Sequence, residues 1–259
     1  EFGELAAETG AVNLGQGFPD WAPPDFVVAE GVRALREGYH QYTRPAGHPP
    51  LAEVLAKRYS THLRRRVDAT SEVAVTVGAS QALYLTLQAL VNPGDEVVLL
   101  EPAFDLYYGQ VRLAGGVAVG VPLSIDEGEW RLDIDALARV LTPRSKVLVL
   151  NSPHNPTGHC VDAAERAMVA RACSEHDLLA ISDEVYEHCV FPASGATHLP
   201  LAQAEGMRER TITVGSGGKL FGLTGWRVAW AYGPAALVGP IAASHTHLTF
   251  SAPTPLQAG

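Results

Sequence analysis

The sequence predicts an α/β fold, a three-layer α/β/α sandwich built on a mostly parallel sheet of about seven strands. First, short apolar and β-branched segments alternate with segments of helical periodicity from residue 73 onward. Second, the apolar segments show little polar alternation, which is typical of parallel strands buried on both faces. Third, a chain of 259 residues is long enough to enclose one large core.

Before the first strand, residues 1–24 are rich in glycine and proline signals and are expected to form an irregular arm. Helical patterns follow at 25–37 and 51–66. The predicted strands are 73–77, 96–100, 117–121, 147–150, 178–182, 211–214 and 228–232. The predicted helices between them are 80–91, 106–114, 134–141 and 162–176, the last begun by Asp162 with Glu165 three residues later. We therefore expect an arm at 1–24 and one large domain at 25–259. Because a helix is just beginning at 253–259, we also expect the sequence to be part of a longer protein.

Composition excludes several classes of protein. With 19 Lys and Arg against 28 Asp and Glu, the net charge of −9 disfavours a nucleic-acid partner. No apolar run approaches the ~20 residues of a membrane span, so a membrane partner is not expected. Cys160, Cys173 and Cys189 are an odd number without CxxC spacing, which favours a reducing compartment such as the cytoplasm. Because the chain begins at Glu1 without methionine, the sequence does not exclude an organellar leader.

Polar and aromatic residues follow the predicted strands, where ligands bind in open α/β sheets. Ala79 and Ser80 lie in a glycine turn after the first strand, which is either a phosphate site at a helix start or an ordinary turn. Phe104 follows the second strand and could stack on a flat ring or join the core. Asn155 lies in a rigid turn after the fourth strand, where it would present a neutral donor.

An acid and a lysine follow the next two strands. Asp183 is costly to bury unless paired, and a protonated ring nitrogen would suit it, with Tyr186 reaching the same ligand. Lys219 lies in a glycine-rich turn, where a desolvated lysine can lose its proton and form a Schiff base with a carbonyl. Ser216 and Arg227 supply a hydroxyl and a guanidinium suited to phosphate.

These segments also admit other interpretations. The glycine turn alone could equally be a solvated surface loop. It is not a nucleotide P-loop, because Thr213 and Leu220 replace the glycine and the hydroxyl residue that this motif needs. No metal site is expected, because His154 and the histidines at 245 and 247 have no carboxylate or cysteine at ligand spacing.

Taken in order, these groups resemble the fold-type I, class I/II aminotransferases that use pyridoxal 5'-phosphate. Residues 13–20, 41–44 and 101–105 look most like the kynurenine/glutamine transaminase K and methionine aminotransferase branch, with N-succinyldiaminopimelate aminotransferase a near relative. The resemblance covers essentially the whole chain. It implies that 25–259 is the pyridoxal-phosphate-binding large domain of a homodimer and that the C-terminal small domain, with its carboxylate-binding arginine, is absent from this sequence.

The resemblance also assigns roles at the ring of the cofactor. Lys219 would carry the Schiff base and act as general base. Asp183 would pair with the pyridinium nitrogen, an opposite charge that should depress the pKa of the carboxyl. Asn155 and Tyr186 would hydrogen-bond the phenolic oxygen, and Phe104 would stack on the ring.

For the phosphate and the substrate, further residues are implied. The phosphate would be bound by Ala79, Ser80, Ser216 and Arg227, together with Tyr42 of the partner subunit. The substrate, an aromatic, methionine, glutamine or kynurenine-like L-amino acid, would contact Gly17, Phe18, Asn155 and Phe250 of the partner subunit. Ser80 stands where the kynurenine branch tends to have an aromatic residue, so substrate preference is not carried over. The alternatives are a cysteine-conjugate β-lyase on the same cofactor and a non-catalytic ligand-sensing domain.

Overall fold

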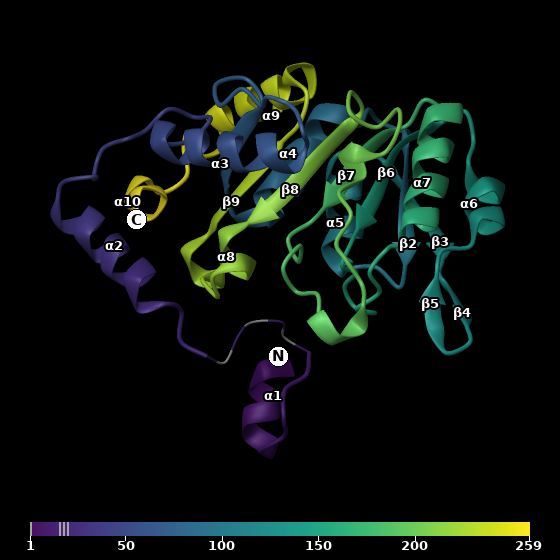
Figure 1. Cartoon of the computed structure of the whole chain (residues 1–259), viewed down its shortest axis with the longest axis horizontal. Helices are drawn as coiled ribbons and strands as arrows, with labels where there is room; N and C mark the ends of the chain where they lie inside the picture. Colours follow the sequence, from purple (N-terminus) through teal and green to yellow (C-terminus); the bar gives the residue numbers. More distant parts are fainter. Residues whose placement is uncertain (1, 16, 18, 20) are drawn as a thin grey trace.

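The computed structural model describes residues 2–15, 17, 19 and 21–259. A seven-stranded sheet runs through the molecule in the order β1-β9-β8-β7-β6-β2-β3, with helices on both faces, as predicted (Figure 1). Its strands are β1 (Val73–Val77), β2 (Glu96–Glu101), β3 (Val117–Pro122), β6 (Ser145–Asn151), β7 (Leu179–Asp183), β8 (Thr211–Ser216) and β9 (Val228–Tyr232). Every predicted strand is present, within three residues at each end.

Strand direction places the functional edge of the sheet. Within this sheet the pairs β2–β3, β2–β6, β6–β7 and β7–β8 are parallel, and β9 runs antiparallel to its two neighbours β1 and β8. The register aligns Asn151 with Asp183, and Asp183 with Val214. The residues that follow β1, β2, β6, β7 and β8 therefore meet at one edge, as the sequence predicted.

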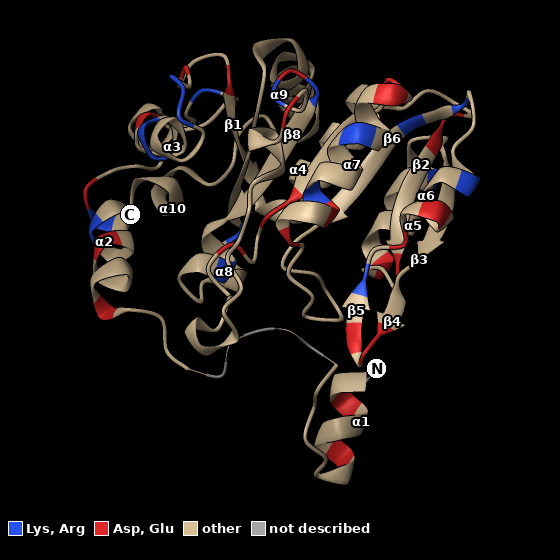
Figure 2. Ribbon diagram, turned by 45° about the vertical axis from the view of Figure 1, so that its right-hand side comes forward, with Lys and Arg blue, Asp and Glu red and all other residues tan. Residues whose placement is uncertain are grey.

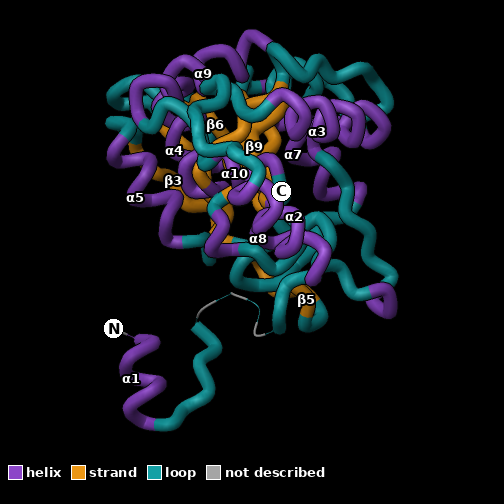
Figure 3. The backbone as a smooth tube through the Cα atoms, turned by 90° about the vertical axis from the view of Figure 1, so that its left-hand side faces the viewer, coloured by secondary structure: helices purple, strands orange, loops and turns teal. Residues whose placement is uncertain are grey.

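Helices cover the two faces of the sheet through separate apolar clusters. On one face, α4 (Gly78–Leu90), α5 (Asp105–Leu113) and α9 (Ala235–Leu248) pack on one cluster. On the other, α6 (Ile134–Val140) and α7 (Ala163–Glu175) share a second cluster, and α3 (Pro49–His62) covers a third. Figure 3 shows the strands between α4 and α5 on one side and α3 and α7 on the other. None of the described helices is long and apolar enough to cross a membrane.

The N-terminal arm corrects one expectation. Residues 1–24 are not irregular throughout, because α1 (Phe2–Thr9) is helical, and its Glu, Leu and Ala residues are strong helix formers. This helix lies apart from the sheet in Figure 1, and all its charges are acidic in Figure 2. Next, α2 (Asp25–Arg36) contacts α10 (Thr254–Ala258), the helix that the sequence showed beginning near its end.

Several element boundaries differ from the sequence pattern for local reasons. Helix α3 ends at His62 rather than at residue 66, because Arg64 has the left-handed φ of 52°. The hairpin of β4 (Ser124–Asp126) and β5 (Glu129–Arg131) was missed, since its strands are short and largely exposed. Helix α9 was missed as well, and it contains an internal proline, Pro240, which sequence rules take as a helix breaker. In contrast, Asp162 and Glu165 form the expected capping box of α7.

Candidate active site

A cavity of about 680 Å³ opens at the carboxyl edge of the parallel strands. Its wall comes from the arm before α2 and from the segments that follow five strands of the sheet. A cavity at this edge is where an open α/β sheet binds its ligand. The sequence-predicted residues that line it are Gly17, Ala79, Ser80, Phe104, Asn155, Asp183, Tyr186, Ser216, Lys219 and Arg227.

Lys219 lies in the short helix α8 (Gly217–Leu220), directly after β8. Its Nζ donates to the carbonyl oxygen of Gly17 at 2.6 Å and lies 5.4 Å from the centroid of the Tyr186 ring. Burial lowers the pKa of Lys219, the Arg227 guanidinium acts in the same direction, and Cys189 and Asp183 oppose the shift. Burial, the largest of these effects, therefore favours the neutral, nucleophilic form of the amine.

Asp183 ends β7 with only 4% of its surface exposed. Its Oδ2 accepts a hydrogen bond from the Tyr107 hydroxyl at 2.7 Å, and its Oδ1 accepts one from the Val185 N–H at 3.3 Å. Burial raises the pKa of Asp183 to about 6, against the lowering effect of both donors. The family resemblance instead implied a depressed pKa for Asp183, and that expectation depends on a cationic ring nitrogen beside the carboxyl. Among the protein's own groups, desolvation has the largest effect and raises the pKa.

The opposite end of the cavity is built for an anion. Helix α4 begins there without a side-chain cap. The N–H groups of its first turn and the positive end of its dipole therefore lie at this end of the cavity. Gly78 has a φ of +74°, and a Cβ atom built on it would lie 2.1 Å from Nη2 of Arg227. Only glycine allows the guanidinium to approach the helix start this closely, which brings Arg227 beside Ala79 and Ser80.

Two residues that organise this site were missed from the sequence. Tyr107 is buried in α5 and bonds Asp183; its spacing of three residues from Phe104, at the start of a helix, was the available signal. Asn151 ends β6, donates from Nδ2 to the Asp183 carbonyl at 2.8 Å and accepts from the Asn155 N–H at 2.7 Å. It therefore fixes the loop that presents Asn155 to the cavity.

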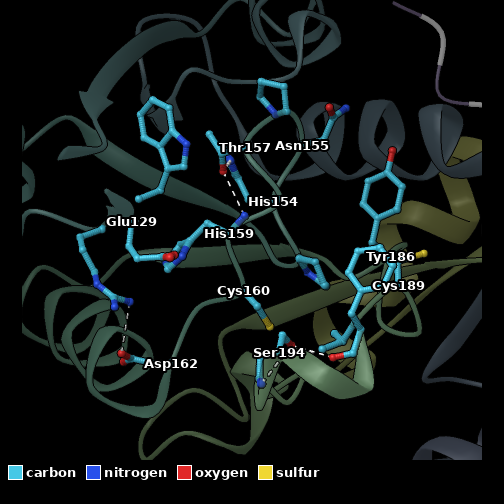
Figure 4. A pocket seen from close by; sticks show the side chains of 18 of the residues that line it. Glu129, His154, Asn155, Thr157, His159, Cys160, Asp162, Tyr186, Cys189 and Ser194 are labelled. Carbon is cyan, nitrogen blue, oxygen red and sulfur yellow. Dashed lines mark hydrogen bonds and ion pairs between the residues drawn. The ribbon is translucent and has the colours of Figure 1, made fainter. Parts of the chain in front are cut away.

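A second cavity, of about 960 Å³, shares Asn155, Pro156 and Tyr186 with the first. It lies between β5, the loop at 153–160 and the segment at 189–196 (Figure 4). The His154 ring and the Thr157 hydroxyl hydrogen-bond at 2.8 Å on its wall. Because it lacks the lysine, the buried acid and the anion end, we place the chemistry in the first cavity and treat the second as an adjoining space.

Two of the sequence-predicted residues, Tyr42 and Phe250, stand apart from the cavity. Tyr42 is 82% exposed and its ring lies 5.0 Å from that of Phe250, which is 43% exposed. Neither belongs to the cavity wall among the described residues. Phe18 lies outside the described residues. The roles given to Tyr42 and Phe250 invoke a partner subunit, so their position in one chain leaves those roles as predictions.

A mostly parallel sheet with a lysine, a buried acid and an anion end at one edge is the arrangement expected of fold-type I pyridoxal-phosphate proteins. The chain belongs to the aminotransferase class I and II family, whose model matches residues 9–259. It is 43% identical to kynurenine–oxoglutarate transaminase 1 of Rattus norvegicus, over 100% of this chain and 63% of the relative.

Solved structures agree with this assignment. N-succinyldiaminopimelate aminotransferase from Mycobacterium tuberculosis superposes with a TM-score of 0.95 at 44% identity, over 99% of this chain and 66% of that one. YbdL from Escherichia coli, whose structure was described with a methionine aminotransferase function, superposes with a TM-score of 0.93 at 35% identity, over 99% of this chain and 67% of that one. This chain thus spans 63% of the length of the rat relative.

Pyridoxal 5'-phosphate is the cofactor of this family, and the cavity fits its three functional parts. The anion end at Gly78 and Arg227 suits a phosphate, and the half-buried Lys219 suits an aldehyde. Asp183 suits a ring nitrogen that carries a proton, because a buried carboxylate needs a cationic partner.

Proposed function

We propose that this chain is the cofactor-binding part of an aminotransferase that moves an amino group from an L-amino acid to a 2-oxo acid. The observation that carries the proposal is the single cavity that holds Lys219, Asp183 and the Gly78–Arg227 anion end. The donor class is aromatic, methionine, glutamine or kynurenine-like, in line with the names of the rat and Escherichia coli relatives. This chain spans 63% of the length of the rat relative, so the activity and the substrates of the whole protein are proposals.

Each residue has a separate task. When bound, pyridoxal phosphate supplies an aldehyde that condenses with primary amines and a ring that withdraws electrons. Lys219 Nζ would be the amine that holds the cofactor and the base that moves the substrate Cα proton. Both tasks need the neutral amine, which the lowered pKa of Lys219 favours. Asp183 would hold a proton at the ring nitrogen, and the Tyr107 hydroxyl orients its Oδ2 by a hydrogen bond. Asn155 and Tyr186 offer hydrogen bonds from neighbouring strand ends.

We further propose a homodimer whose partner subunit completes the site. Tyr42 and Phe250 form an exposed aromatic pair outside the cavity of their own chain, which is consistent with their serving the other subunit. Three free cysteines without CxxC spacing support the cytoplasm as the compartment.

The proposal is tested by the visible spectrum of the full-length protein with pyridoxal phosphate, in wild type and in Lys219→Ala. We expect an absorbance band of lysine-bound cofactor in wild type and its loss in Lys219→Ala. Lys57→Ala, a change at an exposed lysine outside the cavity, is the matched control and should keep the band. A donor screen then distinguishes transamination, which yields a new amino acid, from β-elimination, which yields pyruvate and ammonia. A colourless wild type with added cofactor contradicts the proposal.

A further inference from the structure

A polar cluster lies on the sheet face opposite α4 and α5, near the C-terminal end of α3. It comprises His62 at the end of α3, Glu184 directly after β7, and His198 in the loop before the 3-10 helix η2 (Leu201–Gln203). One imidazole nitrogen of each histidine and one carboxylate oxygen of Glu184 all lie within 4.8 Å of one another. The cluster is separate from the cavity described above, none of whose walls these residues form.

The Glu184 carboxylate is fixed in orientation. Its side chain is 3% exposed. Oε1 accepts hydrogen bonds from the Ser182 hydroxyl at 2.8 Å and from the Leu201 N–H at 3.2 Å. The other oxygen, Oε2, lies 3.0 Å from Nε2 of His198, a side chain that is 7% exposed. One oxygen thus has two structural donors, and the second faces Nε2 of His198.

The His62 imidazole contributes a nitrogen without a partner. Its Nε2 is buried and has no hydrogen-bond partner among the described residues. The rings of His62 and His198 are nearly parallel, with an interplanar angle of 11° and centroids 6.3 Å apart. The Gln203 side chain donates to the backbone carbonyl of His62, which ties the helix end to the loop that carries His198. A buried nitrogen left unpaired costs free energy, so its persistence beside a carboxylate and a second imidazole points to a ligand.

The neighbouring charges are already paired. Glu187 accepts from Arg58 Nη2 and from the Tyr59 hydroxyl, each at 3.2 Å, so its carboxylate is engaged outside the cluster. This leaves Glu184 as the carboxylate available to a cation between the two histidines.

We propose that His62, Glu184 and His198 bind one divalent transition-metal ion of the zinc class. Two imidazole nitrogens and one carboxylate oxygen form a ligand set typical of zinc and cobalt, with water completing the fourth position. The outermost ligand atoms must draw in, since zinc ligands at ~2.0–2.2 Å from the metal lie closer together than the present limit of 4.8 Å. Because Glu184 directly follows Asp183, the ion would brace the backbone that presents the active-site acid.

Sequence spacing does not reveal this group. The expectation of no metal site rested on His154 and the histidines at 245 and 247, whereas the three ligands here are separated by 122 and 14 residues, at positions 62, 184 and 198. In the structure, the Nδ1 of His245 lies 2.9 Å from the Pro45 carbonyl, which is an ordinary structural contact.

The test is calorimetric titration of the cofactor-free, full-length protein with Zn²⁺ alone, and with Co²⁺ alone to follow its visible absorption. We expect one ion per chain and at least a tenfold weaker affinity in His62→Ala. His247→Ala, a change at an exposed histidine outside the cluster, is the matched control and should bind as wild type. His62→Asn is a second variant that keeps a polar side chain, and circular dichroism checks that each variant is folded.

Each outcome decides the proposal. Loss of the site in both folded His62 variants, with retention in His247→Ala, supports it. Absence of one-to-one binding in wild type, or equal affinity in wild type and the His62 variants, overturns it. No pyridoxal phosphate is used, so the result is independent of the proposed aminotransferase activity.

Discussion

At the scale of single residues, the tyrosine that hydrogen-bonds the buried acid offers the most direct way to change the pKa of that acid. Replacing Tyr107 with Phe removes the O–H that donates to Asp183 Oδ2 at 2.7 Å. That bond opposes the effect of burial, so its loss should raise the pKa of Asp183 further. We expect the acid limb of the kcat/KM profile of the full-length enzyme to move to higher pH, with about a tenfold loss near neutrality.

The neighbouring Tyr108 provides the control for that change. Its hydroxyl donates to Glu101 rather than to Asp183, so Tyr108→Phe should leave the acid limb in place. An unshifted profile in Tyr107→Phe would show that the hydrogen bond does not tune the acid.

The same acid also affects stability. Its folded pKa of about 6 lies above the ordinary value of 3.8, so the folded chain binds the proton more tightly than the unfolded chain. The contribution of the Asp183 proton to stability is therefore greatest below the ordinary pKa of 3.8 and is lost as pH rises through about 6. Asp183→Asn should stabilise the cofactor-free chain by up to about 3 kcal/mol at pH above 6, and by little at low pH.

Urea unfolding at several pH values measures this difference. Asp126→Asn, a change at an exposed aspartate in β4, is the control and should give the same stability difference at every pH. If the gap between wild type and Asp183→Asn does not widen as pH rises, burial does not govern the Asp183 proton.

At the scale of elements, the junction between β1 and α4 decides phosphate affinity. In Gly78→Ala, the new Cβ would lie 2.1 Å from Arg227 Nη2, and the backbone would keep a φ of +74° that alanine adopts poorly. The guanidinium must move away from the helix start, so we expect at least a tenfold weaker binding of pyridoxal phosphate, measured by fluorescence titration.

A second glycine separates strain from displacement. Gly94→Ala has the same kind of backbone, with a φ of +89°, but its Cβ would meet nothing within 4 Å. Both variants should lose stability, roughly 1 kcal/mol or more each, because alanine disfavours positive φ. Only Gly78→Ala should lose cofactor affinity; equal affinity in the two variants would remove Arg227 from the phosphate site.

At the scale of the whole molecule, the sequence predicted what periodicity and strand ends determine. Buried strands such as β7 and β8 were visible because they are short segments rich in apolar and β-branched residues. Asp183 stood out because it is a charged residue at the end of such a segment, and Lys219 because it lies in the glycine-rich turn that follows one. Tyr107 was missed because a tyrosine in an amphipathic helix is normally interpreted as a core residue. Only the structure shows that its hydroxyl lies 2.7 Å from the Asp183 carboxylate. The group of His62, Glu184 and His198 was missed because only the folded sheet brings its members together.

The proposed homodimer predicts that two inactive variants can complement each other, which a site formed within a single chain does not allow. If Tyr42 serves the partner subunit, Tyr42→Ala and Lys219→Ala damage different components of each site. A mixed dimer then holds one site with an intact Lys219 and a Tyr42 donated by the other subunit. Random exchange of the two inactive full-length variants should restore up to about a quarter of the wild-type sites.

Activity assayed after unfolding and refolding the two variants together measures this recovery, and each variant refolded alone is the control. The recovery depends on a two-fold interface at which the same surface of each chain faces the other, so that each subunit gives its Tyr42 and receives one. If Tyr42 acted within its own chain, a mixed dimer would contain no complete site and co-refolding would restore nothing. The exposed ring of Tyr42, 82% accessible and outside the cavity wall, favours the first outcome.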